Sequence, residues 1–117
     1  MAIKAYEIPG KSITLVPTAS FEDKRYTLVT AGTNGELVTA TAAGNAVGVL
    51  QTPGIAGEPC RVMIDGVSFV KLGGTVANGA AVEVGTGGAV VSATTGKVVG
   101  IALVGGAAND IGCILIK

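Results

Sequence analysis

The side chains that most often carry catalysis are missing from this chain. Its 117 residues include no histidine. Histidine is the commonest general base and metal ligand, and it activates the nucleophile in Ser-His and Cys-His catalysis. The composition therefore excludes those mechanisms, and we expect a protein that is not an enzyme.

Carboxylates are the remaining source of acid–base chemistry. Glu36 and Glu83 are the candidates, and each falls beside a turn or at an alternating position of a strand. Nothing around them in the sequence forces a carboxylate into an apolar pocket, the environment that raises a pKa for acid catalysis. We expect both side chains to face solvent, so the sequence predicts no catalytic residues.

Cys60 and Cys113 are the two cysteines of the chain. One interpretation is a disulfide or a metal pair, and the other is two small buried apolar residues. Two thiols without a histidine make a poor metal site, and cysteines stay reduced in a cytoplasm. We therefore expect buried thiols, no metal and no cofactor.

Glycine-rich stretches at 73–74, 85–88 and 105–106 suggest phosphate binding, but none precedes a predicted helix or matches a P-loop. Residues 76–82 resemble part of the flattened barrel of biotinyl and lipoyl carrier domains. Those domains need a lysine at an exposed hairpin tip, whereas Lys71 falls inside a predicted strand. The sequence therefore offers no attachment site for a carrier function.

Charge and hydropathy limit the possible partners. Lys and Arg together number eight, as do Asp and Glu, while 49% of the residues are hydrophobic. Without a basic patch there is little counterion release, so we expect no nucleic-acid partner. No run reaches the roughly 18 apolar residues of a membrane span, and the N-terminus lacks the apolar core of a signal peptide. We expect a chain that is made in a cytoplasm and that associates with itself or with a partner, because low net charge favours association.

An internal duplication places these residues on repeated elements. Residues 32–41 match residues 85–94 at six of ten positions. After one skipped residue the match continues toward the C-terminus. With a further slip it also extends backwards, where residues 13–16 lie over residues 67–70. We interpret these matches as two tandem copies of one unit.

The first copy is residues 12–65 and the second copy is residues 66–117, and by length the two make one domain, 12–117. Val, Ile and Thr are frequent in both, and turn residues recur every 8–12 residues, which is typical of β-sandwiches and barrels. The predicted fold class is all-β, a compact barrel or sandwich built from two tandem pseudo-symmetric copies. We expect each copy to cover the other's apolar face, and a hairpin at Asp65-Gly66 to join them. The predicted strands are 12–16, 26–30, 36–41, 46–51, 60–65, 67–72, 80–84, 89–93, 97–104 and 111–116.

Residues 1–11 precede the duplication and are predicted to be an N-terminal arm that ends at Pro9-Gly10. The alternative is an ordinary edge strand. Ile3, Tyr6 and Ile8 are the large apolar side chains of the arm, and they are the predicted partner-binding residues. A strand-like arm can add to a partner's sheet edge through backbone hydrogen bonds. We therefore expect the arm to matter more for docking than for folding.

Short motifs typical of strands and turns occur from residue 47 onward, followed by Asn109-Asp110 and an apolar final strand. They lie at 47–50, 57–58, 61–67, 76–79 and 99–103. Over about residues 45–117 these motifs resemble the small capsid-decoration, or cement, proteins of tailed bacteriophages. The resemblance implies a non-enzymatic, barrel-like β domain that binds the outer surface of a phage head and stabilises the shell.

The same resemblance implies the major capsid protein as partner, assembly as a homotrimer, and a location in the virion after synthesis in the host cytoplasm. It supplies no catalytic residues. The alternative function is a soluble β-barrel module that presents loops to a protein or carbohydrate partner. Scarce aromatic residues, 3% of the chain, argue against sugar binding.

Overall fold

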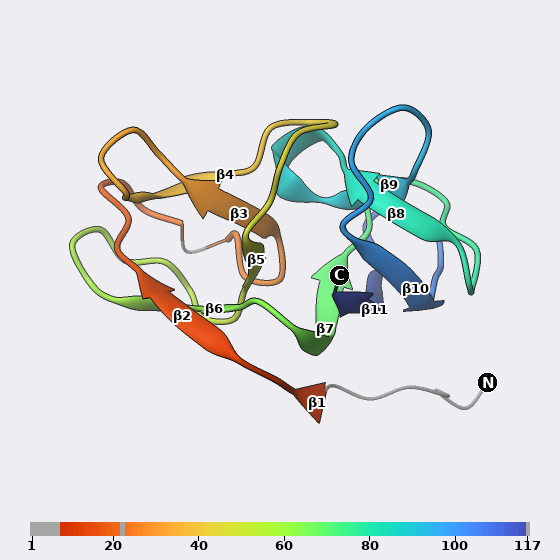
Figure 1. Cartoon of the computed structure of the whole chain (residues 1–117), viewed down its shortest axis with the longest axis horizontal. Coiled ribbons are helices and arrows are strands. Elements are labelled where there is room, and N and C mark those ends of the chain that lie inside the picture. Colours follow the sequence, from red (N-terminus) through yellow and green to blue (C-terminus); the bar gives the residue numbers. More distant parts are fainter. Residues whose placement is uncertain (1–7, 22, 117) are drawn as a thin grey trace.

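The computed structural model describes residues 8–21 and 23–116. Within them the chain forms two antiparallel sheets, which lie side by side along the longest axis of the molecule (Figure 1). The helical structure in this part of the chain is one short 3-10 turn, η1 (Thr86–Gly88). The predicted all-β class is therefore confirmed.

The first sheet holds the five strands of the first copy in the spatial order β2-β6-β5-β3-β4. Its strands are β2 (Ser12–Leu15), β3 (Leu28–Ala31), β4 (Leu37–Thr39), β5 (Gly48–Leu50) and β6 (Cys60–Met63). The second sheet has the order β7-β11-β10-β8-β9, extended at the β7 edge by β1. Its strands are β1 (Ile8–Pro9), β7 (Gly66–Lys71), β8 (Ala81–Val84), β9 (Val90–Ser92), β10 (Gly100–Val104) and β11 (Ile111–Ile116). Apart from β1, the two orders are the same strand for strand, as two tandem copies of one unit require.

Each sheet bends back on itself toward a barrel. In the first copy, Pro17 just after β2 forms a parallel bridge with Leu37 of β4, the strand at the opposite edge of the sheet. In the second copy, Leu72 just after β7 forms the matching parallel bridge with Val90 of β9. Each copy is therefore a small, nearly closed barrel of five strands.

The loops repeat as well as the strands. Phe21 bridges Gly54 in the first copy, and Val76 bridges Gly106 in the second. The backbone enters the left-handed region at matching positions of the two copies, namely Tyr26 and Gly79, Gly35 and Gly88, and Gly57 and Asn109.

The strand register corrects one part of the sequence alignment. The alignment placed Ile13 over Val67, but the ladders place Ser12 there. Ser12 pairs with Met63 in the first sheet, and Val67 pairs with Leu115 in the second. Met63 and Leu115 occupy the same place in the duplication, so β2 is shifted by one residue relative to the alignment. With this shift, the side chains that point into each barrel coincide. Residues at the same place in the two ladders are termed counterparts below.

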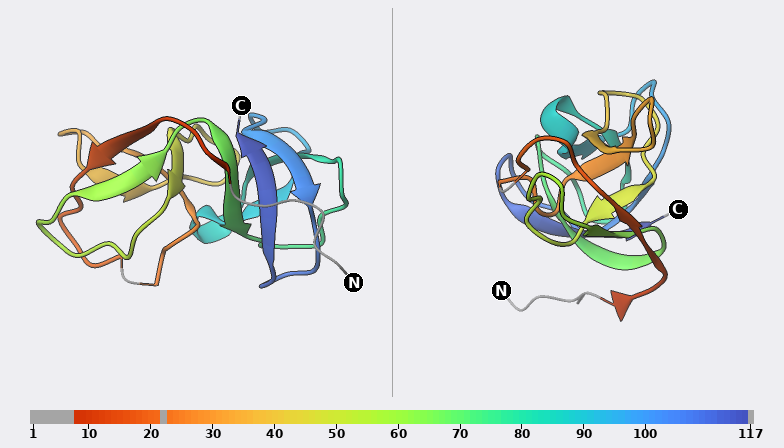
Figure 2. Two further views of the ribbon diagram at one scale, coloured as in Figure 1. Left: turned by 90° about the horizontal axis from the view of Figure 1, so that it is seen from below. Right: turned by 90° about the vertical axis from the view of Figure 1, so that its left-hand side faces the viewer.

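The junction between the copies differs from the prediction. The expected hairpin at Asp65-Gly66 is wrong, because β6 pairs with β2 and β5 whereas β7 pairs with β1 and β11. Both edges of each strand are already occupied, so the chain passes from one sheet into the other at this point (Figure 2). The predicted positive φ at Gly66 is confirmed at 100°, and Asp65 accepts a hydrogen bond from the Lys11 amide at 2.7 Å.

Strands β3 and β5 bury both of their faces. One face carries Val29 and Leu50, which lie in the core cluster of the first copy. The other face carries Leu28 and Val49, which pack in the larger cluster of the second copy. Successive side chains of a strand point to opposite faces, so this double burial places the first sheet directly against the second copy. The larger cluster also contains Ala40, Val70, Leu72, Val76, Val82, Val84, Val90, Val99, Ala102 and Ile114.

Candidate functional site

The predicted partner-binding residues lie at the start of the chain. Ile3 and Tyr6 are outside the described residues. The backbone of Ile8 is in β1, where it pairs with Val67 of β7, and its side chain is also outside the described part. Residues 8–9 are therefore tied to the edge of the second sheet, and the binding role of the three side chains stays a prediction.

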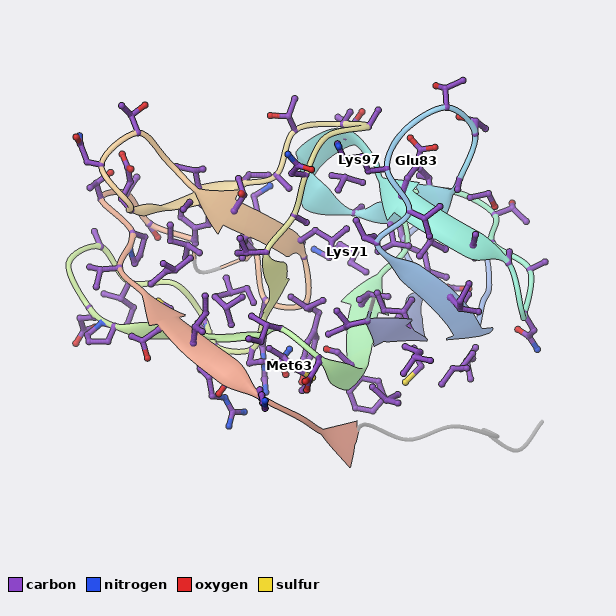
Figure 3. The ribbon with its side chains drawn as sticks, viewed as in Figure 1. Met63, Lys71, Glu83 and Lys97 are labelled. Atoms are coloured by element: carbon purple, nitrogen blue, oxygen red, sulfur yellow. The ribbon has the colours of Figure 1, made fainter. Side chains whose placement is uncertain are left out.

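Glu83 contradicts the expectation that both candidate glutamates face solvent. Glu83, labelled in Figure 3, lies on β8. It is only 4% exposed. The carboxylate accepts hydrogen bonds from the Thr94 amide, from the Thr94 hydroxyl at 3.2 Å and from the Gly96 amide at 3.3 Å. The sequence carried no local signal for this burial, because Glu83 stands between two valines of a strand, where alternation predicts the face away from the core. Glu36 is partly exposed and accepts a hydrogen bond from the Asn34 amide at 3.0 Å.

These hydrogen bonds decide the chemistry of Glu83. The bond from the Thr94 amide lowers the pKa of the carboxyl group, and although burial raises it, the bonds from Gly96 and the Thr94 hydroxyl lower it further. A general acid needs a raised pKa, so the geometry holds an ionised group that fixes the 94–96 loop. That loop touches the first copy, because a Cβ added at Gly96 would lie 2.7 Å from Ala43 Cα.

The cysteines behave as small apolar residues, as one interpretation of the sequence expected. Cys60 on β6 and Cys113 on β11 are each 2% exposed, and Cys60 belongs to the core cluster of the first copy. Among residues 8–21 and 23–116, no group of three or more His, Cys, Asp and Glu side chains could hold a metal ion. No helix in the same residues is long and apolar enough to cross a membrane.

The glycine-rich stretch at 85–88 packs between the copies. Gly88 has a φ of +81°, and a Cβ added there would lie 2.6 Å from the Leu28 carbonyl oxygen. The close approach of the β8–β9 turn to β3 therefore requires glycine at this position. Its counterpart Gly35 has a φ of +79° and no neighbouring atom within 4 Å of an added Cβ, so the corresponding turn of the first copy is uncovered.

Polar bonds across the boundary hold the two copies together. The Gln51 side chain donates to the Ser68 hydroxyl at 2.9 Å, and both residues are buried. The Lys71 amide donates to the Tyr26 carbonyl at 2.9 Å, with Lys71 placed between the two halves in Figure 3. The Tyr26 ring also meets the Phe69 ring edge-on, with centroids 5.8 Å apart. Sequence reasoning expected the copies to cover each other but missed these polar contacts, because the partners come from separate segments of the chain.

On the side that faces the second copy, the first sheet presents a row of side chains that crosses its strands. Leu28 pairs with Val49, and Val49 pairs with Met63, so the three lie side by side on one face of β3, β5 and β6. With Gln51, which follows β5, all are 3% exposed or less. We define these residues and the partly buried Ala46 as the outer face of the first copy.

The counterparts of these residues form the outer face of the second copy, and this face is open. Ala81 pairs with Ile101, and Ile101 pairs with Leu115, which repeats the row of the first copy. Val98, Leu103 and Leu115 are 37 to 50% exposed, while Ala81 and Ile101 are half-buried. We expected each copy to cover the apolar face of the other. The second copy does cover the outer face of the first, but the outer face of the second copy is not covered.

No protein-family model matches the sequence, and no curated protein matches it. Among solved structures, the chain is similar in fold to the N base of head fiber gp8.5 of bacteriophage phi29, which is known from a crystal structure. The two superimpose with a TM-score of 0.74 over 92% of this chain and 93% of that chain, at 18% sequence identity. At this identity the likeness concerns the fold, and it extends over both copies.

Proposed function

We propose that this protein is a non-enzymatic structural protein of a tailed-phage head, which binds the outer surface of the shell and stabilises it. The observation that carries the proposal is the fold, shared over 92% of the chain with the base of a phage head fiber. The sequence motifs that resemble capsid-decoration proteins support the same role. The open apolar side chains of both copies supply contact area for assembly.

The proposed partner is the major capsid protein, and the proposed binding unit is a homotrimer. Ile3, Tyr6 and Ile8 are the residues that we expect to contact the capsid. Supporting this, the described chain begins with a two-residue strand at a sheet edge, where further backbone pairing can start. Burying each large apolar side chain contributes roughly 1.5–3 kcal/mol before the arm is ordered, so backbone hydrogen bonds must assist the side chains.

Reconstitution on phage heads tests this proposal. Heads purified from a phage lacking the gene are mixed with the protein, and bound protein is measured by co-sedimentation and quantitative gel analysis. We expect saturable, stoichiometric binding and a higher temperature of head disruption. The control variant is Ile55→Asp, which changes an exposed apolar residue in a loop far from the arm in sequence. Absence of the protein from purified wild-type virions would contradict the proposal.

A further inference from the structure

The contact between the two copies joins unlike surfaces. The first copy contributes its outer face. The second contributes a different set of residues, the receiving face. Around the core residues that bury Leu28 and Val49, this face includes Ser68, Phe69, Lys71, Val84 and Gly88. A contact between unlike surfaces is heterologous, so each copy keeps one surface that its neighbour in the chain does not use.

The unused surface of the second copy is its outer face. Three of its side chains, Val98, Leu103 and Leu115, are large, apolar and exposed. Their counterparts in the first copy, Ala46, Gln51 and Met63, are buried or partly buried at the boundary. Corresponding strands therefore make this contact in the first copy and leave the same face open in the second.

The unused surface of the first copy is its receiving face. The ladders and the matching bridges make Ile13, Thr14 and Val16 the counterparts of Ser68, Phe69 and Lys71. All three are exposed, with Ile13 at 38% and Val16 at 40%. The remaining two counterparts of the receiving face are also exposed, namely Ala31 and Gly35.

We propose that the open outer face of one molecule docks on the open receiving face of a second copy of this chain. The contact between the two copies within one molecule is then repeated between molecules. This inference deepens the proposed function, because it rests on self-assembly of the chain and names the surfaces that join it. A heterologous contact of this kind forms a closed ring if the rotation closes, or a filament if it does not.

The composition of the two surfaces favours this occupant. No charged side chain belongs to either, so docking them leaves no ion unpaired in an apolar contact. Five of the eight large hydrophobic side chains that are exposed in the described residues belong to these two faces: Ile13, Val16, Val98, Leu103 and Leu115. A second copy of the chain presents the counterparts of the two surfaces that already meet within one molecule, on the same strands but with more apolar side chains.

Complementation between two variants tests the proposal. The outer-face variant carries Val98→Asp and Leu103→Asp, and the receiving-face variant carries Ile13→Asp and Val16→Asp. The control is Ile55→Asp, an exposed apolar residue outside both faces. Oligomeric state is measured by analytical ultracentrifugation over a hundredfold range of concentration, with circular dichroism to check folding.

We expect the wild type and the control to assemble, and each variant to be monomeric with at least a tenfold weaker association constant. Mixed together, the two variants should form a one-to-one dimer that cannot grow, because each retains the surface that the other lacks. The inference is overturned if the wild type is monomeric, if either variant keeps the wild-type assembly, or if the mixture stays monomeric. If a double variant loses its circular dichroism spectrum, Leu103→Ser and Val16→Ser replace it in the same design.

Head binding separates this inference from the proposed function. If the variants bind heads at wild-type stoichiometry and also assemble normally in solution, the proposed docking surfaces are wrong and the head role stands. If the wild type does not bind heads, the proposed function is wrong, whatever the complementation shows.

Discussion

In the first copy the outer sheet face is buried by the second copy, whereas in the second copy the same face is open. In part of this face the local differences are small. Leu28 corresponds to Ala81 and Val49 to Ile101, and β3 pairs with β5 in the same register as β8 with β10. The exposure of this face therefore depends on the position of a copy in the tandem rather than on its secondary structure.

Tyr26 shows how the buried side has adapted to its neighbour. Its φ is 67°, while its counterpart Gly79 has a φ of 83°. Both amides make the same bond, to the carbonyl of Leu50 in the first copy and of Ala102 in the second. A tyrosine is strained in this conformation where glycine is not, but it gains the ring contact with Phe69. The strain is found where the second copy packs against the residue.

The largest expected effect comes from truncating matched residues of the two outer faces. Met63→Ala should lower the free energy of unfolding by about 2–5 kcal/mol, because it leaves a cavity at a buried site. Leu115→Ala removes an exposed side chain and should change it by less than about 0.5 kcal/mol. Urea denaturation at concentrations where the protein is monomeric measures both. Equal losses would mean that the faces are equally covered in solution.

Two glycines sharpen the comparison through the backbone. Gly35→Ala should cost about 1–2 kcal/mol, the penalty of a left-handed alanine. Gly88→Ala carries the same penalty and also forces a Cβ toward the Leu28 carbonyl, so we expect at least about 1 kcal/mol more. The difference between the two melting curves, converted to free energy, isolates the contact between the copies. A difference near zero would place the β8–β9 turn away from the first copy.

Acid should destabilise the second copy through Glu83, whose counterpart in the first copy, Thr30, does not titrate. The folded pKa of Glu83 is lowered from 4.5, so its ionised form stabilises the fold fully above that value. This contribution is lost as pH falls through the folded pKa. The Tm of the wild type should fall as the pH drops below 4.5, partly because Glu83 becomes protonated. In Glu83→Gln this part of the decrease should be absent. An unchanged pH profile in the variant would assign the acid sensitivity to other carboxylates.

The smallest effect is expected at the start of the chain. Deleting residues 2–7 keeps β1 and should shift the Tm of the free protein by less than about 3 °C, which corresponds to less than about 1 kcal/mol. Binding to phage heads should weaken clearly in the same variant. If the truncated protein unfolds instead, residues 2–7 contribute to the fold of the body, and the arm interpretation is wrong.

Much of the fold could be predicted from the sequence, because strand periodicity and turn residues are local signals. Each of the ten predicted strands overlaps a strand of the structure. The hairpin at Asp65-Gly66 could not be excluded, since its turn chemistry is correct and only the pairing of β6 and β7 with other strands rules it out. The one-residue shift of β2 likewise appears only in the ladders.

The site was harder to predict, because it depends on what lies across the boundary between the copies. Glu83 was assigned to solvent, although its partners Thr94 and Gly96 follow only 11 and 13 residues later. The contact of Gln51 with Ser68 joins the two copies, and neither segment alone indicates how the copies are arranged in space. Ile3 and Tyr6 remain predictions from composition alone.

The pairing of the first sheet has a consequence for biosynthesis. All of its ladders lie between Ser12 and Met63, so they can form before β7 has been synthesised. At that stage Leu28 and Val49 are without the residues that later bury them. On a polysome, where several nascent chains are close together, this temporary surface is open to the second copy of a neighbouring chain. The tandem order thus leaves this face uncovered until the second copy has been made.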